Sequence, residues 1–188
     1  MNYIETMQIA PAVLRLPDVR QTTDYSCGPT ALQAVLGYYG EEHFEEDLME
    51  LCKADPNEGT PPERLAEAAR SLGFQTEIRQ NMTLDDLQAS VQQGIPVIIA
   101  AQAWRNQDQL NTPWSNIWDS GHWMVTVGMD ENNVYFEDPS ILGSLGSIPR
   151  EEFLQRWHDI DADQPFIHGG LLISGKTPAP PPLVMHVD

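Results

Sequence analysis

The segment Gln21-Thr-Thr-Asp-Tyr-Ser-Cys27-Gly-Pro-Thr-Ala31 constrains the fold of this chain more than any other. Pro29 lacks a backbone N–H and has a fixed φ, so it suits the first turn of a helix but not a helix interior. Apolar residues then recur at helical spacing from Ala31 to Tyr39, and Gly40 ends the pattern. The pattern predicts a helix that begins at or just after Cys27. The thiol would then lie where unpaired N–H groups and the helix dipole favour an anion.

A cysteine in that position has two interpretations. Its thiol is favoured to ionise, and the thiolate is the form that attacks carbonyl groups. Alternatively, it is a buried structural residue, which is the usual fate of a single cysteine. The second cysteine, Cys52, lies on the apolar face of an expected helix at 45–53 and is predicted to fill the core. Two cysteines make neither a disulfide framework nor a zinc ligand set, so we expect no metal and no cofactor.

The charge balance excludes several classes of partner. The chain has 28 acidic and 10 basic residues and a formal net charge of -18. Such a surface repels phosphate backbones and anionic membranes, so we expect no nucleic-acid binding and no membrane binding. It would attract a cationic peptide, although solubility is the simpler explanation of the charge. No secretory signal or membrane-spanning stretch is visible, and the expected location is the cytoplasm.

The pattern along the chain predicts one α+β domain over residues 1–176 and a proline-rich extended tail at 177–188. Helices are expected first, including one that starts at Thr60-Pro-Pro with Thr60 as its N-cap and one capped by Thr83. Strands dominate the second half. They are expected at 96–100, 122–129, 134–137 and 166–174.

Strands 122–129 and 134–137 are joined by a turn and form a predicted hairpin. Going out and back along it brings Asp138 to about the level of His122. A histidine suits proton transfer near neutral pH, and a carboxylate on its other nitrogen would fix the tautomer. The Gln21 amide and the Cys27 N–H would supply an oxyanion hole. Taken singly, each residue has a structural alternative: a satisfied core histidine, an Asp-Pro turn, a surface glutamine.

Residues 101–121 are polar, lack periodicity and form a loop of a length that is usually functional or mobile. Candidate substrate-binding residues in and beside this loop are Trp104, Trp114, Trp118 and Trp123. Aromatic side chains here would line a substrate groove or pack the loop onto its own domain.

In combination, the order Gln21, Cys27, His122 and Asp138 resembles the papain-like cysteine peptidases. More specifically it resembles the C39 peptidase group, whose best-known members trim double-glycine leaders from bacteriocin precursors. The resemblance spans about residues 18–175. Its matching segments are Gln21, Cys27-Gly-Pro-Thr-Ala-Leu32, Gly121-His122-Trp-Met-Val125, Glu137-Asp138-Pro139-Ser140 and residues 148–157.

The resemblance implies a papain-like fold, with an N-terminal helical half that begins at the Cys27 helix and a C-terminal antiparallel sheet that carries His122 and Asp138. It implies that Cys27 is the nucleophile, His122 the general acid and base, Asp138 the orienting carboxylate and Gln21 an oxyanion donor. The substrate would be a peptide or protein, cut at a peptide or isopeptide bond. Ser26 stands where the exporter peptidases usually carry aspartate, so the resemblance extends to peptidase chemistry rather than to double-glycine specificity.

Three alternatives remain open at this point. In the first, the chain transfers an acyl group, as the related phytochelatin synthases do. In the second, it binds a peptide without cutting it, as C39-like domains without the cysteine do. The third is an interaction protein driven by its negative charge. The presence of all four residues favours an enzyme, because a groove that only binds needs no nucleophile and base.

Overall fold

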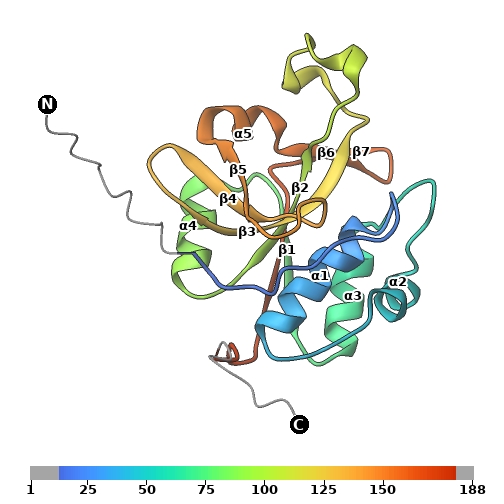
Figure 1. The fold of residues 1–188 in the computed structure, drawn as a ribbon, viewed down its shortest axis with the longest axis vertical. Helices are drawn as coiled ribbons and strands as arrows, with labels where there is room; N and C mark the ends of the chain where they lie inside the picture. Colours follow the sequence, from blue (N-terminus) through green and yellow to red (C-terminus); the bar gives the residue numbers. More distant parts are fainter. Residues whose placement is uncertain (1–12, 181–188) are drawn as a thin grey trace, which may run out of the picture.

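The structure is a computed structural model that describes residues 13–180 (Figure 1). Most of the predicted tail, residues 181–188, lies outside the described residues. The elements in chain order are α1 (Cys27–Tyr38), α2 (Glu45–Cys52), α3 (Pro62–Ser71), β1 (Gln75–Arg79), α4 (Leu84–Gln92), β2 (Val97–Gln102), η1 (Gln107–Gln109), η2 (Trp114–Asn116), β3 (Gly121–Met129), β4 (Asn133–Glu137), β5 (Gly146–Pro149), α5 (Arg150–Arg156), β6 (His158–Asp161), β7 (Gln164–Ile167) and β8 (Gly170–Ser174).

The main sheet is antiparallel and has the strand order β1-β8-β2-β3-β4-β5. Helices cover both faces of its central strands. Because successive side chains of a strand point in opposite directions, each of these strands contributes to two cores. In β2, Ile98 and Ala100 join the core under α1, α2 and α3, whereas Val97 and Ile99 join the core under α4 and α5. Figure 1 shows the two helical layers on either side of the sheet. The predicted α+β fold class is confirmed.

The helix starts follow from their first residues. α1 begins at Cys27, as predicted, and α4 begins with the predicted cap at Thr83. α3 differs, because its first residue is Pro62 and Pro61 occupies the N-cap position. A proline pushes the residue before it out of the helical region, so neither Thr60 nor Pro61 can join the helix. Thr60 is therefore not the cap, and its Oγ1 has no hydrogen-bond partner among residues 13–180.

A β-bulge lies in the hairpin that carries the candidate histidine and aspartate. Tyr135 pairs with Gly128, but Phe136 pairs with Thr126, so Val127 is an extra residue in β3. Extending the pairing by one residue places Asp138 opposite Met124. Residues opposite each other in a sheet share a face, and so do residues two apart in one strand. The bulge therefore puts Asp138 on the face of His122.

The last part of the chain departs from the prediction. The expected strand at 166–174 is divided between β7 and β8, and the break falls at His168, whose φ is 44°. β7 pairs instead with β6, a strand that the sequence did not predict, in a separate two-stranded sheet. This hairpin lies beside the ends of β2 and β3, close to the start of α1 (Figure 1).

Candidate active site

Cys27 is the first residue of α1 and is 8% exposed. The helix approaches β3 closely here because residue 28 is a glycine. A Cβ on Gly28 would lie 3.1 Å from Trp123 Cδ1 and 3.2 Å from Thr60 Cβ, closer than side chains normally pack. The glycine thus lets the end of the helix, with its unpaired N–H groups, sit against the strand that carries His122.

His122 and Asp138 form a buried pair. The histidine Nε2 lies 2.7 Å from Asp138 Oδ1, and both side chains are less than a tenth exposed. The same Oδ1 accepts a hydrogen bond of 2.8 Å from the Ser140 backbone N–H. With Nε2 as the donor to the carboxylate, Nδ1 is the ring nitrogen available to the Cys27 thiol.

The environment of His122 favours its charged form. Burial alone would lower the pKa of His122, but the hydrogen bond to Asp138 and the interaction with the Cys27 thiol raise it to about 9. The ring is therefore an imidazolium at neutral pH, next to a sulfur at a helix N-terminus. A thiol in such surroundings can act as a nucleophile toward a carbonyl carbon. Cys52 is different, because burial raises the pKa of its thiol to about 12.

Gln21 is tied to the segment that follows Asp138. Its backbone N–H donates to the Pro139 carbonyl at 3.0 Å, and its side-chain Oε1 accepts from Ser140 Oγ at 3.2 Å. The side-chain Nε2 donates to the Thr23 carbonyl at 2.8 Å. An amide nitrogen carries two hydrogens, so one remains for another acceptor.

Two of the four candidate tryptophans line a cavity of about 320 Å³ together with Asp138. Trp104 is 60% exposed and has a φ of 55°, an uncommon backbone conformation for a large side chain. Trp114 lies between two guanidinium groups, with Arg105 4.3 Å and Arg156 3.9 Å from the centre of its ring. These stacks hold the loop against α5.

The other two tryptophans lie elsewhere. The Trp118 ring packs on His158, with the ring centres 4.2 Å apart, and it lines none of the described cavities. Trp123 is buried, and its indole N–H donates to the Thr60 carbonyl at 3.0 Å. It lines a second cavity, between the loop before α3 and the β6–β7 hairpin.

Two acidic side chains beside the site have no role predicted from the sequence. Glu137 is 4% exposed, and its Oε1 accepts from the Val19 N–H at 3.2 Å. The Asp159 carboxylate occupies the space where a Cβ at Gly121 would be. Glu137 lies in a segment that matches the C39 group, but nothing in the sequence indicates that its side chain is buried, and no motif relates Asp159 to the cysteine or the histidine.

Within residues 13–180, no group of three or more histidine, cysteine, aspartate or glutamate side chains is arranged to hold a metal ion. In the same part of the chain, no helix combines the length and the apolar character needed to cross a bilayer.

Comparisons with known proteins show the family of the chain and its fold. A sequence model of the Peptidase_C39 like family matches residues 13–164 of the chain. An uncharacterized protein of Methanothermobacter thermautotrophicus is 32% identical over 135 residues, which are 72% of this chain and 78% of that protein.

Two solved structures share the fold. A putative C39-like peptidase from Bacillus anthracis has a TM-score of 0.68 at 22% identity, over 89% of this chain and 98% of that one. A double glycine motif protease from an AMS/PCAT transporter, solved in complex with its leader peptide, has a TM-score of 0.59 at 20% identity. That similarity covers 87% of this chain and 95% of the protease.

Proposed function

Because this chain belongs to the Peptidase_C39 like family, we propose that it is a cysteine peptidase that hydrolyses a peptide or isopeptide bond through Cys27, His122 and Asp138. The observation that carries the proposal is the buried pair of His122 and Asp138, 2.7 Å apart, next to the Cys27 thiol at the start of α1. A binding groove that did not cut its ligand would have no need of this arrangement.

In the first half of the reaction, the Cys27 thiolate attacks the carbonyl carbon of the scissile bond. The oxygen becomes an oxyanion, which the free Gln21 amide hydrogen and the Cys27 N–H stabilise. The carbon–nitrogen bond then breaks, and the His122 imidazolium gives its proton to the leaving amine. Asp138 holds the ring so that Nδ1 faces the sulfur throughout.

In the second half, neutral His122 takes a proton from a water molecule, which attacks the thioester carbonyl. The carbon–sulfur bond breaks, the acid product leaves, and the thiolate and imidazolium are restored. No step consumes another reagent.

The substrate class is supported by the relatives. The double glycine motif protease that shares the fold was solved with a bound leader peptide. A peptide segment, free or within a protein, is therefore the proposed substrate here.

A library of synthetic peptides tests this function. We expect the wild-type protein to generate new peptide termini, detected by mass spectrometry, and the Cys27→Ala and His122→Ala variants to generate none. Cys52→Ala is the matched control, because it removes the other thiol at a completely buried position in α2. It should keep its activity.

Circular dichroism of each variant shows whether the fold is intact. Peptide cleavage by folded Cys27→Ala would contradict the proposal. Attachment of added glycinamide to the new C-terminus, in place of water, would assign acyl transfer instead of hydrolysis.

A further inference from the structure

The cavity that Trp123 lines has a volume of about 350 Å³ and lies next to Cys27 and His122. Two of its lining residues place it there. Gly28, which follows Cys27, packs tightly against Trp123 and Thr60, and both of these residues line the cavity. Trp123 itself follows His122. When a peptide substrate binds with its scissile bond at the Cys27 sulfur, the substrate residues next to that bond would lie over this cavity.

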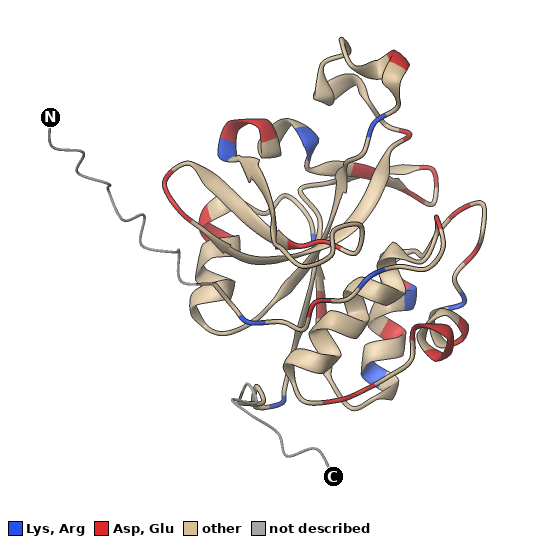
Figure 2. Cartoon of the chain, viewed as in Figure 1, with Lys and Arg blue, Asp and Glu red and all other residues tan. Residues whose placement is uncertain are grey.

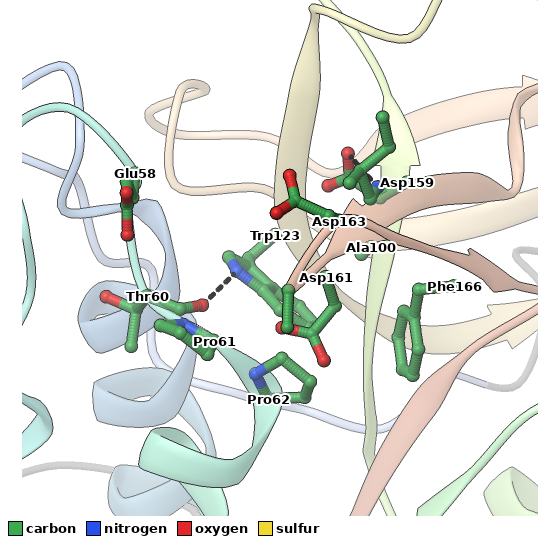
Figure 3. Close-up of a pocket in the computed structure, with 12 residues that line it drawn as sticks. Glu58, Thr60, Pro61, Pro62, Ala100, Trp123, Asp159, Asp161, Asp163 and Phe166 are labelled. Carbon is green, nitrogen blue, oxygen red and sulfur yellow. Dashed lines mark hydrogen bonds between the residues drawn. The ribbon is translucent and has the colours of Figure 1, made fainter.

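The walls differ in chemistry. Figure 3 shows Thr60, Pro61 and Pro62 on one side, Trp123 in the middle and the β6–β7 hairpin on the other side. The indole, the two proline rings, Ala100 and Phe166 are apolar surfaces. The acidic side chains are Glu58, Asp159, Asp161 and Asp163. A ligand with an aliphatic stem and a positively charged end matches both kinds of wall.

Within residues 13–180, no lysine or arginine pairs with the carboxylates of the cavity, and the cation that acts on Asp159 is the His122 ring. The ion pairs of that region involve other carboxylates, and none joins Asp159, Asp161 or Asp163 to a lysine or arginine. Burial raises the pKa of Asp159 to about 6, and burial followed by repulsion from Glu63 raises the pKa of Asp161. Carboxylates that are partly desolvated and unpaired favour the approach of a cation. Figure 2 shows acidic residues on the β6–β7 hairpin, which forms one wall of the cavity.

A metal ion is a poor candidate for the cation, because these carboxylates are not arranged to coordinate one.

We propose that this cavity is a subsite for a lysine or arginine side chain of the substrate, adjacent to the bond that Cys27 attacks. The aliphatic stem lies on Trp123 and the prolines, and the charged end lies among Asp159, Asp161 and Asp163. The subsite rests on the proposed function, since it is defined relative to the scissile bond. It assigns the enzyme to peptides with a basic residue near the cleavage point.

Matched peptides test the subsite. Synthetic ten-residue peptides carry lysine at one position in turn, and their partners carry norleucine, which has a similar stem without the charge. At one position near the cleaved bond, we expect kcat/KM to be about tenfold or more higher for lysine, the effect of one close charge pair. In Asp161→Asn this ratio should fall, because one of the three carboxylates around the charged end is lost.

Glu131→Gln is the control, because it removes one exposed negative charge from the turn between β3 and β4. It should leave the lysine preference unchanged, which separates a local contact from the effect of net charge. Equal cleavage of both peptides by the wild type, or a preference that is undiminished in Asp161→Asn, would overturn the subsite.

A failure of the proposed function has a different signature. If no peptide is cut, fluorescence anisotropy measures the binding of labelled lysine and norleucine peptides to Cys27→Ala. Lysine peptides that bind about tenfold more tightly, and lose at least part of this advantage in Cys27→Ala with Asp161→Asn, would support the subsite without hydrolysis. Equal affinities would reject it.

Discussion

His122 Nε2 contacts Asp138 Oδ1 at 2.7 Å, just beyond the last paired residues of β3 and β4. The contact determines which nitrogen of the ring is left for Cys27. It also ties the charge of the histidine to a carboxylate that directly follows the neighbouring strand, β4.

Alkylation by iodoacetamide should distinguish the two cysteines without any substrate. The imidazolium of His122 persists up to about pH 9, because Asp138 and Cys27 raise its pKa against the opposing effect of burial. An imidazolium next to the sulfur favours nucleophilic attack, so we expect rapid labelling of Cys27 at neutral pH, measured by mass spectrometry. His122→Ala should abolish the rapid phase. Cys52, whose pKa burial raises to about 12, is the internal control and should stay unlabelled. Equal labelling rates of Cys27 in the wild type and in His122→Ala would contradict the assembled pair.

Removal of the Asp138 carboxylate should change both the rate and its pH dependence. The carboxylate favours the imidazolium, so Asp138→Asn should lower the pKa of His122 from about 9. We expect kcat/KM to fall by roughly 10²–10⁴. The alkaline limb of its pH profile, near pH 9 in the wild type, should move to lower pH. An unchanged limb would show that Asp138 has only a structural role.

Gln21 should act in the transition state rather than in binding. We expect Gln21→Ala to lower kcat by roughly 10²–10³ with little change in KM, because the donor acts on charge that develops only during the attack. Gln21→Glu keeps the shape, replaces the donor by an acceptor and should be at least as slow. Steady-state kinetics measure both variants. An effect confined to KM would assign Gln21 to substrate binding.

Glu137 should destabilise the fold at neutral and alkaline pH. Burial first, and then repulsion by Asp18 and Asp138, raise its pKa from 4.5 to about 7 in the folded state. The folded protein therefore binds the proton more tightly than the unfolded chain. The proton on Glu137 thus stabilises the folded state. This stabilisation is complete below about pH 4.5 and is lost as pH rises through about 7.

Glu137→Gln removes that loss. Above pH 7 we expect its free energy of unfolding to exceed that of the wild type by roughly 1–3 kcal/mol, with a smaller difference at pH 5. Urea titrations at both pH values give the difference, and taking it between the two proteins cancels the titration of His122. The same change at exposed Glu131 should have no such effect. A lower stability of Glu137→Gln at pH 8 would contradict the prediction.

The sequence was informative where local chemistry decides the structure. The proline in the first turn placed the start of α1 at Cys27, and the apolar run from His122 with its turn identified the β3–β4 hairpin. The bulge at Val127 has no local signature, because the sequence of a buried strand does not distinguish a bulged valine from a paired one. The separation of His122 from Asp138 along the sequence therefore suggested proximity but did not determine the face on which they meet.

The acidic wall of the second cavity was invisible for a related reason. It depends on a sharp change of direction at His168, whose positive φ is rare outside glycine and cannot be recognised from the residue type. Without that break, β7 and β8 read as one strand. Asp159 and Asp161 then appear as charges in a loop, with nothing to place them near Cys27.

α1 and β3 contribute to one apolar core, in which Ala31 and Val35 of the helix join Val125 and Val127 of the strand. The sulfur and the imidazole come from these two elements and meet only while the core is intact. Under the proposed function, a molecule that unfolds by separating α1 from β3 loses the pairing of thiol and imidazole, and with it the ability to cut the chain segments that unfolding exposes.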